Sequence, residues 1–195
     1  MQTAHELFLH ELSDMLDAEQ KLVEALGKQA EESSRPELQK AFESHRQQTE
    51  KQVERLQQVF ESLEEESEDA ECKGIKGIIE EHDEFMDEEE PSEDLIDIFN
   101  IGAACKVEHY EIANYSSLIN LAQQMGHTKA VKLLNQNLKE EQQTLKKMEG
   151  FAKKVKPERL MDEEEEAEEG EEGEEMEEVS SQRKQPARGK SRKVA

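Results

Sequence analysis

Two glutamates interrupt the apolar stripe of a predicted helix in the segment CKVEHYEIANY, residues 105–115. Glu108 and Glu111 are three residues apart, so both lie on the helix face that also carries Tyr115 and Leu118. A buried carboxylate without a partner costs several kcal/mol. The pattern therefore predicts that something beyond apolar packing occupies this level of the helix.

The other predicted helices show the same interruption. Read in alternating steps of three and four residues, each apolar stripe has a polar residue near its middle, which is Glu19, His45 or Glu141. The stripe around Glu19 includes Leu9 and Val23, and the stripe around Glu141 includes Leu138 and Leu145. Glu19 and His45 are nearly equidistant from a predicted turn near residue 33, and Glu111 and Glu141 from one near residue 127. Residues equidistant from a hairpin turn lie side by side, so we expect all these side chains at one level of a bundle.

Carboxylates gathered in a core must bind protons, basic side chains or metal ions. No Lys or Arg occupies the central positions of the four stripes, which weakens the second option. Carboxylates with one imidazole suit iron or manganese, as one or two ions. A single glutamate in such a stripe more commonly lies at its edge, with its head group in water. Glu140 lies off the stripe and is kept as a reserve ligand, and Tyr115 is either core or a donor to a ligand carboxylate.

Helix boundary signals frame four long helical segments. Thr3 with Glu6 forms a capping-box pattern, and Ser34 with Glu37 repeats it around Pro36. The other boundary signals are Pro91 and Ser92 before the third segment, Gly126 at its end, and Thr128 as the cap of a fourth that runs to about Pro157.

The connections between these segments predict the fold class. Short turns make two antiparallel hairpins, whereas residues 64–91 form a long connection with a short helix expected around residues 75–85. Two hairpins joined by one long crossover define the ferritin-like variant of the four-helix bundle. The sequence thus predicts an all-α, ferritin-like antiparallel four-helix bundle over residues 1–160.

Composition separates that bundle from a tail at residues 161–195. The chain has 49 acidic and 25 basic residues and a formal charge of −24. Residues 162–178 are strongly acidic and residues 183–193 basic, so we expect the tail to be disordered. An acidic body argues against nucleic acid as its partner, leaving only weak contact through the basic end; adaptation to a salty cytoplasm is a rival explanation of the charge.

Compartment signals point to the cytoplasm. Two cysteines are too few for a disulfide framework. The N-terminal residues are amphipathic and acidic, unlike a signal peptide, and no stretch is long and apolar enough for a membrane span.

Four segments resemble the YciF/YciE-like stress proteins, a ferritin-like family: LSDMLDAEQKLVEAL, LQKAFESHRQQTEKQVERLQQVF, VEHYEIANYSSL and LLNQNLKEEQQTLKKM. The resemblance covers about residues 4–155 and implies a bacterial stress role, a homodimer and a di-metal centre. Carried over by position, it implies these ligands: Glu19, His45, Glu108, Glu111 and Glu141. Gln52 fits the family as a weak ligand and Gln48 is a further reserve ligand, although Gln48 and Leu145 stand where the family usually has acidic residues.

Two functions follow as hypotheses. One is a protein whose carboxylate-rich site holds iron or manganese and oxidises the metal or scavenges peroxide. The other is a non-catalytic stress or interaction protein with a degraded metal site, which Gln48 and Leu145 motivate.

Overall fold

The computed structural model describes residues 1–156, and within them the chain is all-helical. A compact unit spans Met1–Val155, and its helices are α1 Ala4–Glu32, α2 Pro36–Leu63, α3 Lys73–Glu89, α4 Glu93–Gln124 and α5 Thr128–Ala152. The all-α prediction is confirmed. The expected disorder of residues 161–195 and the expected domain end at residue 160 lie outside the described residues.

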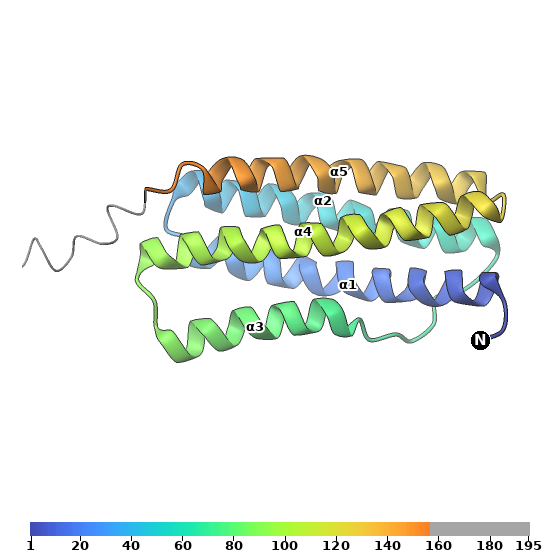
Figure 1. Ribbon diagram of the computed structural model, residues 1–195, viewed down its shortest axis with the longest axis horizontal. Coiled ribbons are helices and arrows are strands. Elements are labelled where there is room, and N and C mark those ends of the chain that lie inside the picture. The colour runs from blue at the N-terminus through green and yellow to red at the C-terminus, as the bar shows by residue number, and fades with distance from the viewer. Residues whose placement is uncertain (157–195) are drawn as a thin grey trace, which may run out of the picture. The chain divides into compact units, whose positions relative to one another are not determined.

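Four long helices form the bundle, and α3 lies outside it (Figure 1). The hairpins α1–α2 and α4–α5 are antiparallel, and they pack through α1 against α4 and α2 against α5. The crossover carries the chain back along the bundle, so α4 runs in the same direction as α2. The predicted crossover helix exists and is longer than residues 75–85, because it extends over Lys73–Glu89.

Helix α3 packs against α1 and α4. Near the start of α3, the backbone at Gly74 packs closely against the ring of Tyr110. A Cβ atom at this position would lie only 2.5 Å from Cε2 of Tyr110, so the absence of a side chain at Gly74 permits the contact. The hydroxyl of Tyr110 lies 3.1 Å from Sγ of Cys72. The backbone N–H of Cys72 donates to a carboxylate oxygen of Asp17 at 2.7 Å. These contacts anchor the start of α3 on the bundle.

The helix caps test the boundary predictions one by one. The capping box of Thr3 and Glu6 is confirmed in both directions. The prediction that Ser34 caps the N-terminus of α2 is wrong. Arg35 is the N-cap residue and makes no side-chain capping hydrogen bond. The Ser34 hydroxyl donates instead to Asp97 at 2.8 Å. The cap predicted at Thr128 is also displaced, since His127 holds that position.

The buried core has two apolar clusters. One includes Phe8, Leu12 and Leu118, and the other, toward the α1–α2 turn, includes Phe42 and Ile101. His45 on α2 and Glu141 on α5 lie between the two clusters along their helices, and Glu19, Glu108 and Glu111 have buried apolar residues on both sides. Apolar layers on both sides exclude water from that level, so any charge there is desolvated.

The predicted stripes drift away from the observed ones at several positions. In α1, Phe8 and Leu22 are buried where the three-and-four steps selected Leu9 and Val23. A helix of 3.6 residues per turn rotates by about 20° per heptad relative to a 3.5-residue repeat. The same rotation places Asn137 and Thr144 of α5 in the interior, and leaves their neighbours Leu138 and Leu145 only half-buried.

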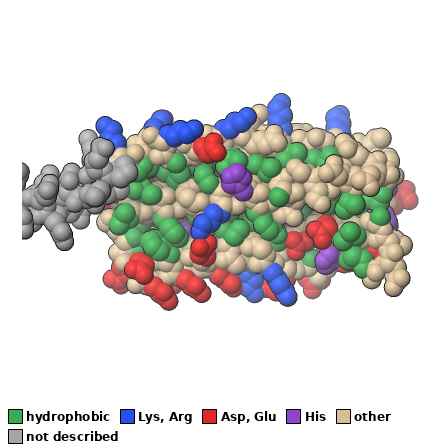
Figure 2. All heavy atoms as spheres, in the orientation of Figure 1, with side chains coloured by type: hydrophobic (Ala, Val, Ile, Leu, Met, Phe, Trp, Pro, Cys, Tyr) green, Lys and Arg blue, Asp and Glu red, His purple; other side chains and the backbone are tan. Residues whose placement is uncertain are grey.

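Surface charge is unevenly distributed over the face drawn in Figure 2. Lysine and arginine side chains follow the edge at α5, whereas most of the acidic side chains, with some basic ones among them, lie along the opposite edge near α3. Among residues 1–156, no helix combines the length and apolar character needed to cross a bilayer.

Candidate metal centre

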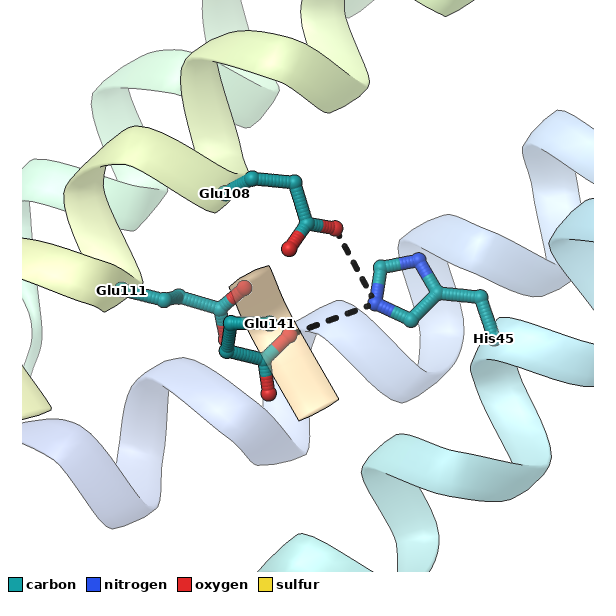
Figure 3. Close-up of side chains that lie close together, drawn as sticks. All are labelled: His45, Glu108, Glu111 and Glu141. Atoms are coloured by element: carbon teal, nitrogen blue, oxygen red, sulfur yellow. Dashed lines mark ion pairs between the residues drawn. The ribbon is translucent and has the colours of Figure 1, made fainter. Parts of the chain in front are cut away.

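Four side chains able to bind a metal meet at the centre of the bundle. His45 comes from α2, Glu108 and Glu111 from α4, and Glu141 from α5; each offers a ligand atom within 4.8 Å of the others'. The Nε2 atom of His45 lies 3.2 Å from Oε1 of Glu108 and 3.8 Å from Oε2 of Glu141 (Figure 3). All four residues are at most 4% exposed.

Most polar atoms of this cluster have no hydrogen-bond partner among the described residues. They include both oxygens of Glu108, one each of Glu111 and Glu141, and both nitrogens of His45. Buried polar atoms in native proteins are nearly always satisfied. The cluster therefore needs a partner that residues 1–156 do not provide.

Burial changes the acidity of these carboxyl groups. Desolvation raises the pKa of Glu108 and of Glu111 well above the usual range for glutamate, and the nearby charge of Glu141 raises both further. Without a cation, these groups therefore hold protons more strongly than an exposed glutamate. A bound divalent cation would displace those protons.

The fifth predicted residue, Glu19 of α1, lies beside this group of four rather than within it. Its Oε1 accepts a hydrogen bond from the hydroxyl of Tyr115, and its Oε2 has no partner among the described residues. Burial raises the pKa of Glu19 well above its usual range, and the charge of Glu141 adds to this effect. The Tyr115 hydroxyl in turn accepts from Nδ2 of Asn137 at 2.9 Å.

The reserve ligand Glu140 is held away from the cluster. Both of its oxygens accept from the guanidinium of Arg55, at 2.7 and 2.9 Å, and Arg55 also donates to Oδ1 of Asn137 at 2.5 Å. Arg55 lies outside the predicted stripes yet reaches a buried amide next to Tyr115. Its charge lowers the pKa of Glu19, against the larger effect of burial.

The two glutamines and Leu145 occupy different surroundings. Gln52 is buried and donates to Oε1 of Glu141. Gln48 is only partly buried, and its amide donates to the Thr144 hydroxyl at 3.4 Å. Leu145, the second departure from the family pattern, is half-buried. Gln52 thus orients a cluster carboxylate, while Gln48 is engaged with a hydroxyl.

Sequence reasoning missed the role of Asn137 and Arg55. Asn137 lies one residue before Leu138, which the three-and-four steps selected for the interior. A strict 3.6-residue periodicity starting from Glu141 would have found Asn137 at i−4. No local signal marks Arg55, because its partner Glu140 is on another helix.

The donor set fits a hard divalent cation. Three carboxylates and one imidazole offer oxygen and nitrogen ligands, and no thiolate is among them. The guanidinium of Arg55 does not neutralise these carboxylates by hydrogen bonding, because it donates to Glu140 and Asn137. Such a set suits iron or manganese better than metals that prefer sulfur. The unpartnered oxygens are the observation that supports this fit, because they need a positive partner.

The fold and this buried cluster define a helical-bundle protein with a carboxylate–histidine core site. Residues 3–161 match the family described as a domain of unknown function, DUF892. The chain is also 42% identical over 153 residues to Protein YciF of Escherichia coli K12, covering 78% of this chain and 92% of that protein. The chain therefore belongs to the DUF892 family, and the predicted resemblance to YciF is confirmed.

Similar structures agree with this assignment. The crystal structure of the E. coli stress protein YciF has a TM-score of 0.74 and 41% identity, covering 78% of this chain and 96% of that one. YcfI, a putative structural protein from Rhodopseudomonas palustris, also has a TM-score of 0.74, at 38% identity over 76% of this chain and 94% of that one. A protein from Xanthomonas campestris shares the fold at 19% identity, with a TM-score of 0.62 and coverage of 77% and 92%.

Proposed function

We propose that this protein binds iron or manganese in its core, through His45, Glu108, Glu111 and Glu141, and serves in metal oxidation or peroxide removal under stress. The observation that carries the proposal is the set of buried ligand atoms within 4.8 Å of one another, most of them without a partner among the described residues. The stress role rests on similarity to a protein described as a stress protein.

The four grouped residues supply the donors for one ion. A second ion would depend on Glu19, whose Oε2 lacks a partner among the described residues. When bound, iron or manganese would be oxidised by molecular oxygen or peroxide, each ion giving up one electron. The chain's own groups orient and enclose the site: Tyr115 holds Glu19, Gln52 holds Glu141, and the apolar layers exclude water.

The first test is metal content. We expect protein purified from its native host to contain iron or manganese by elemental analysis, and the double variant Glu108→Gln/Glu111→Gln to lose it. The matched control is Glu84→Gln/Glu88→Gln, which removes two charges from the exposed face of α3. Equal metal content in the wild type and the site variant would refute metal binding at this cluster.

Turnover is tested separately on metal-loaded protein. We expect ferrous ion oxidation or peroxide consumption by the wild type and the α3 control, and neither by the site variant. If the protein holds metal but catalyses neither reaction, the proposed metal site stands and the proposed activity is refuted.

A non-catalytic stress or interaction protein is the second candidate. It is favoured by Gln48, whose amide is bonded to Thr144, and by Leu145, which brings no carboxylate. Native protein without metal, and without a thermal shift on adding Fe²⁺ or Mn²⁺, would favour it. The expected homodimer stays a prediction, which sedimentation can test.

A further inference from the structure

A row of lysines follows the outer face of α5 and its C-cap. Its members are exposed and seven residues apart, and we call them the basic surface: Lys132, Lys139, Lys146 and Lys153. Seven residues make nearly two helical turns, so successive lysines lie almost on one line, about 10.5 Å apart along the helix. The buried residues Ala130 and Met148 lie on the opposite side of α5. The basic surface therefore points away from the core.

The lysines of the basic surface have no acidic partner within their own bundle. All ion pairs of lysine or arginine within residues 1–156 involve other residues. Lys28 is paired with Asp83 and Lys106 with Glu81, for example, each at 2.7 Å. The whole chain has 49 acidic and only 25 basic residues, so a row of unpaired lysines is not what the composition leads one to expect. The row is open to an anionic partner.

Helix α3 presents the complementary charge on the other side of the bundle. It packs against α1 and α4, whereas α5 packs against α4 and α2, and the two helices lie at opposite edges of Figure 1. The acidic surface consists of exposed residues of α3 that form no ion pair with lysine or arginine in the described part of the chain: Glu80, Glu84, Asp87 and Glu88. Glu80 and Asp87 are seven residues apart, so they repeat the spacing of the lysine row.

The net charge of the chain, −24, opposes contact between two copies. At about 0.1 M salt, however, exposed charges more than about 10 Å apart are largely screened from each other. Side chains that meet across a contact lie much closer than this. Attraction between the two facing rows therefore persists, while repulsion between the more distant acids of the two bundles is reduced.

We propose that the basic surface of α5 binds the acidic surface of α3 on a second copy of this chain. The 17 residues of α3 span about 25 Å, enough to face two or three members of the lysine row. Because the two surfaces lie on opposite sides of the bundle, each copy can use both at once, and the copies associate head to tail. None of the contacting residues is a ligand of the metal centre, so the association does not depend on the proposed function.

Sedimentation velocity of the full chain over a series of protein concentrations tests the proposal. At about 0.1 M NaCl we expect the mass to grow beyond that of a dimer as the concentration rises. At about 1 M NaCl the screening length falls to about 3 Å, and we expect association to be at least tenfold weaker. A mass that responds to neither concentration nor salt would overturn the proposal.

Two charge-removing variants locate the contact. Lys139→Gln/Lys146→Gln changes the basic surface and Glu80→Gln/Asp87→Asn the acidic one, and each removes two charges seven residues apart. We expect each variant to weaken association at least tenfold at about 0.1 M NaCl. All four positions are exposed, so circular dichroism and the thermal unfolding curve should stay close to those of the wild type.

Helix α2 provides matched controls. Glu54→Gln/Glu61→Gln removes two exposed acids with the same seven-residue spacing, and Lys40→Gln/Lys51→Gln removes two exposed lysines. Neither control should weaken association. If the acidic control on α2 weakened it as much as Glu80→Gln/Asp87→Asn does, the effect would come from total charge and the proposal would be overturned.

Mixing the two surface variants gives the sharpest test. The α5 variant keeps its acidic surface and the α3 variant keeps its basic surface, so together they can form the contact that neither makes well alone. We expect an equimolar mixture to recover salt-sensitive association with an affinity close to that of the wild type. A mixture that associates no better than its two components would overturn the proposal.

Other partners for the lysine row give different results. Association that is lost in the α5 variant, persists in the α3 variant and disappears on deletion of residues 162–178 would identify that acidic segment as the partner and overturn the proposal. Binding of a DNA duplex through Lys139 and Lys146, tighter than the binding of a second copy, would identify a nucleic acid instead and would also overturn it.

Discussion

Two carboxylates on α4 are equally buried and differ in their surroundings. Asp97 is 1% exposed and Glu108 is 0% exposed, and they lie about three turns apart on the helix. Asp97 accepts hydrogen bonds from the backbone and side chain of Ser34, at 2.9 and 2.8 Å, and from those of Arg35, at 3.3 and 2.8 Å. Glu108 accepts none from the described residues, although His45 lies 3.2 Å away.

The difference separates a structural acid from a site. The chain provides Asp97 with an opposite charge and donors from the α1–α2 turn, so its burial ties that turn to α4. Around Glu108 the other cluster residues are mainly further carboxylates. An acid buried in that way contributes to stability only when a cation or a proton joins it.

Removing the structural acid should have the largest effect on stability. Asp97→Ala leaves the donors of Ser34 and Arg35 without their acceptor, so we expect a loss of about 2–4 kcal/mol in the free energy of unfolding. Urea unfolding measures this loss. Asp94→Ala, at an exposed position on the same helix, should change stability little; equal effects of the two substitutions would contradict the structural role of Asp97.

Metal should stabilise through the Glu108 cluster. At a free Mn²⁺ concentration about 100-fold above its dissociation constant, linkage predicts about 2.7 kcal/mol of stabilisation, or a rise in Tm of about 5–10 °C for a chain of this size. Thermal unfolding with and without Mn²⁺ measures it. The shift should vanish in Glu108→Gln/Glu111→Gln and persist in Asp97→Ala. Its persistence in the site variant would place the metal elsewhere.

The metal-free protein should lose stability as pH rises. The folded-state pKa values of Glu19, Glu108 and Glu111 are raised, so the folded state binds more protons than the unfolded state above about pH 4.3, the usual glutamate pKa. Stability is then full below that pH and falls as pH rises through the raised values.

The variant Glu108→Gln tests this sign. Its neutral amide avoids the cost of a buried charge, so we expect the metal-free variant to be about 1–2 kcal/mol more stable than the wild type at pH 8. At pH 4, where the wild-type carboxyl is protonated, the two proteins should be nearly equal. A variant less stable at pH 8 would show that the wild-type carboxylate has a stabilising partner. Urea unfolding at both pH values, with chelator present, makes the measurement.

The smallest expected effect concerns the link between Glu19 and α5. Tyr115→Phe removes the donor to Glu19 and the acceptor of the Asn137 amide, which should cost about 1–2 kcal/mol. The Mn²⁺-induced shift should remain, because none of the four grouped ligands is changed. Loss of that shift would show that Tyr115 and Glu19 are needed for the first ion as well.

Local sequence determined the helices and the level of the site. Apolar periodicity, together with the capping box of Thr3 and Glu6, is enough to predict α1 without reference to any tertiary contact. The distances of His45 and Glu141 from their turns indicated that they would meet across the bundle. Turn position and helical rise are local properties, so the sequence is enough to set the height of a residue along its helix.

Tertiary structure alone decided what surrounds each polar group. The hydroxyl of Ser34 bonds to Asp97 instead of capping α2, Arg55 takes Glu140 out of the site, and Tyr115 holds Glu19 beside it. The place of the acidic surface, on the other side of the bundle from α5, depends likewise on where the crossover helix packs. These outcomes depend on how each helix is rotated about its own axis and on partners distant in sequence, and neither is fixed by local periodicity.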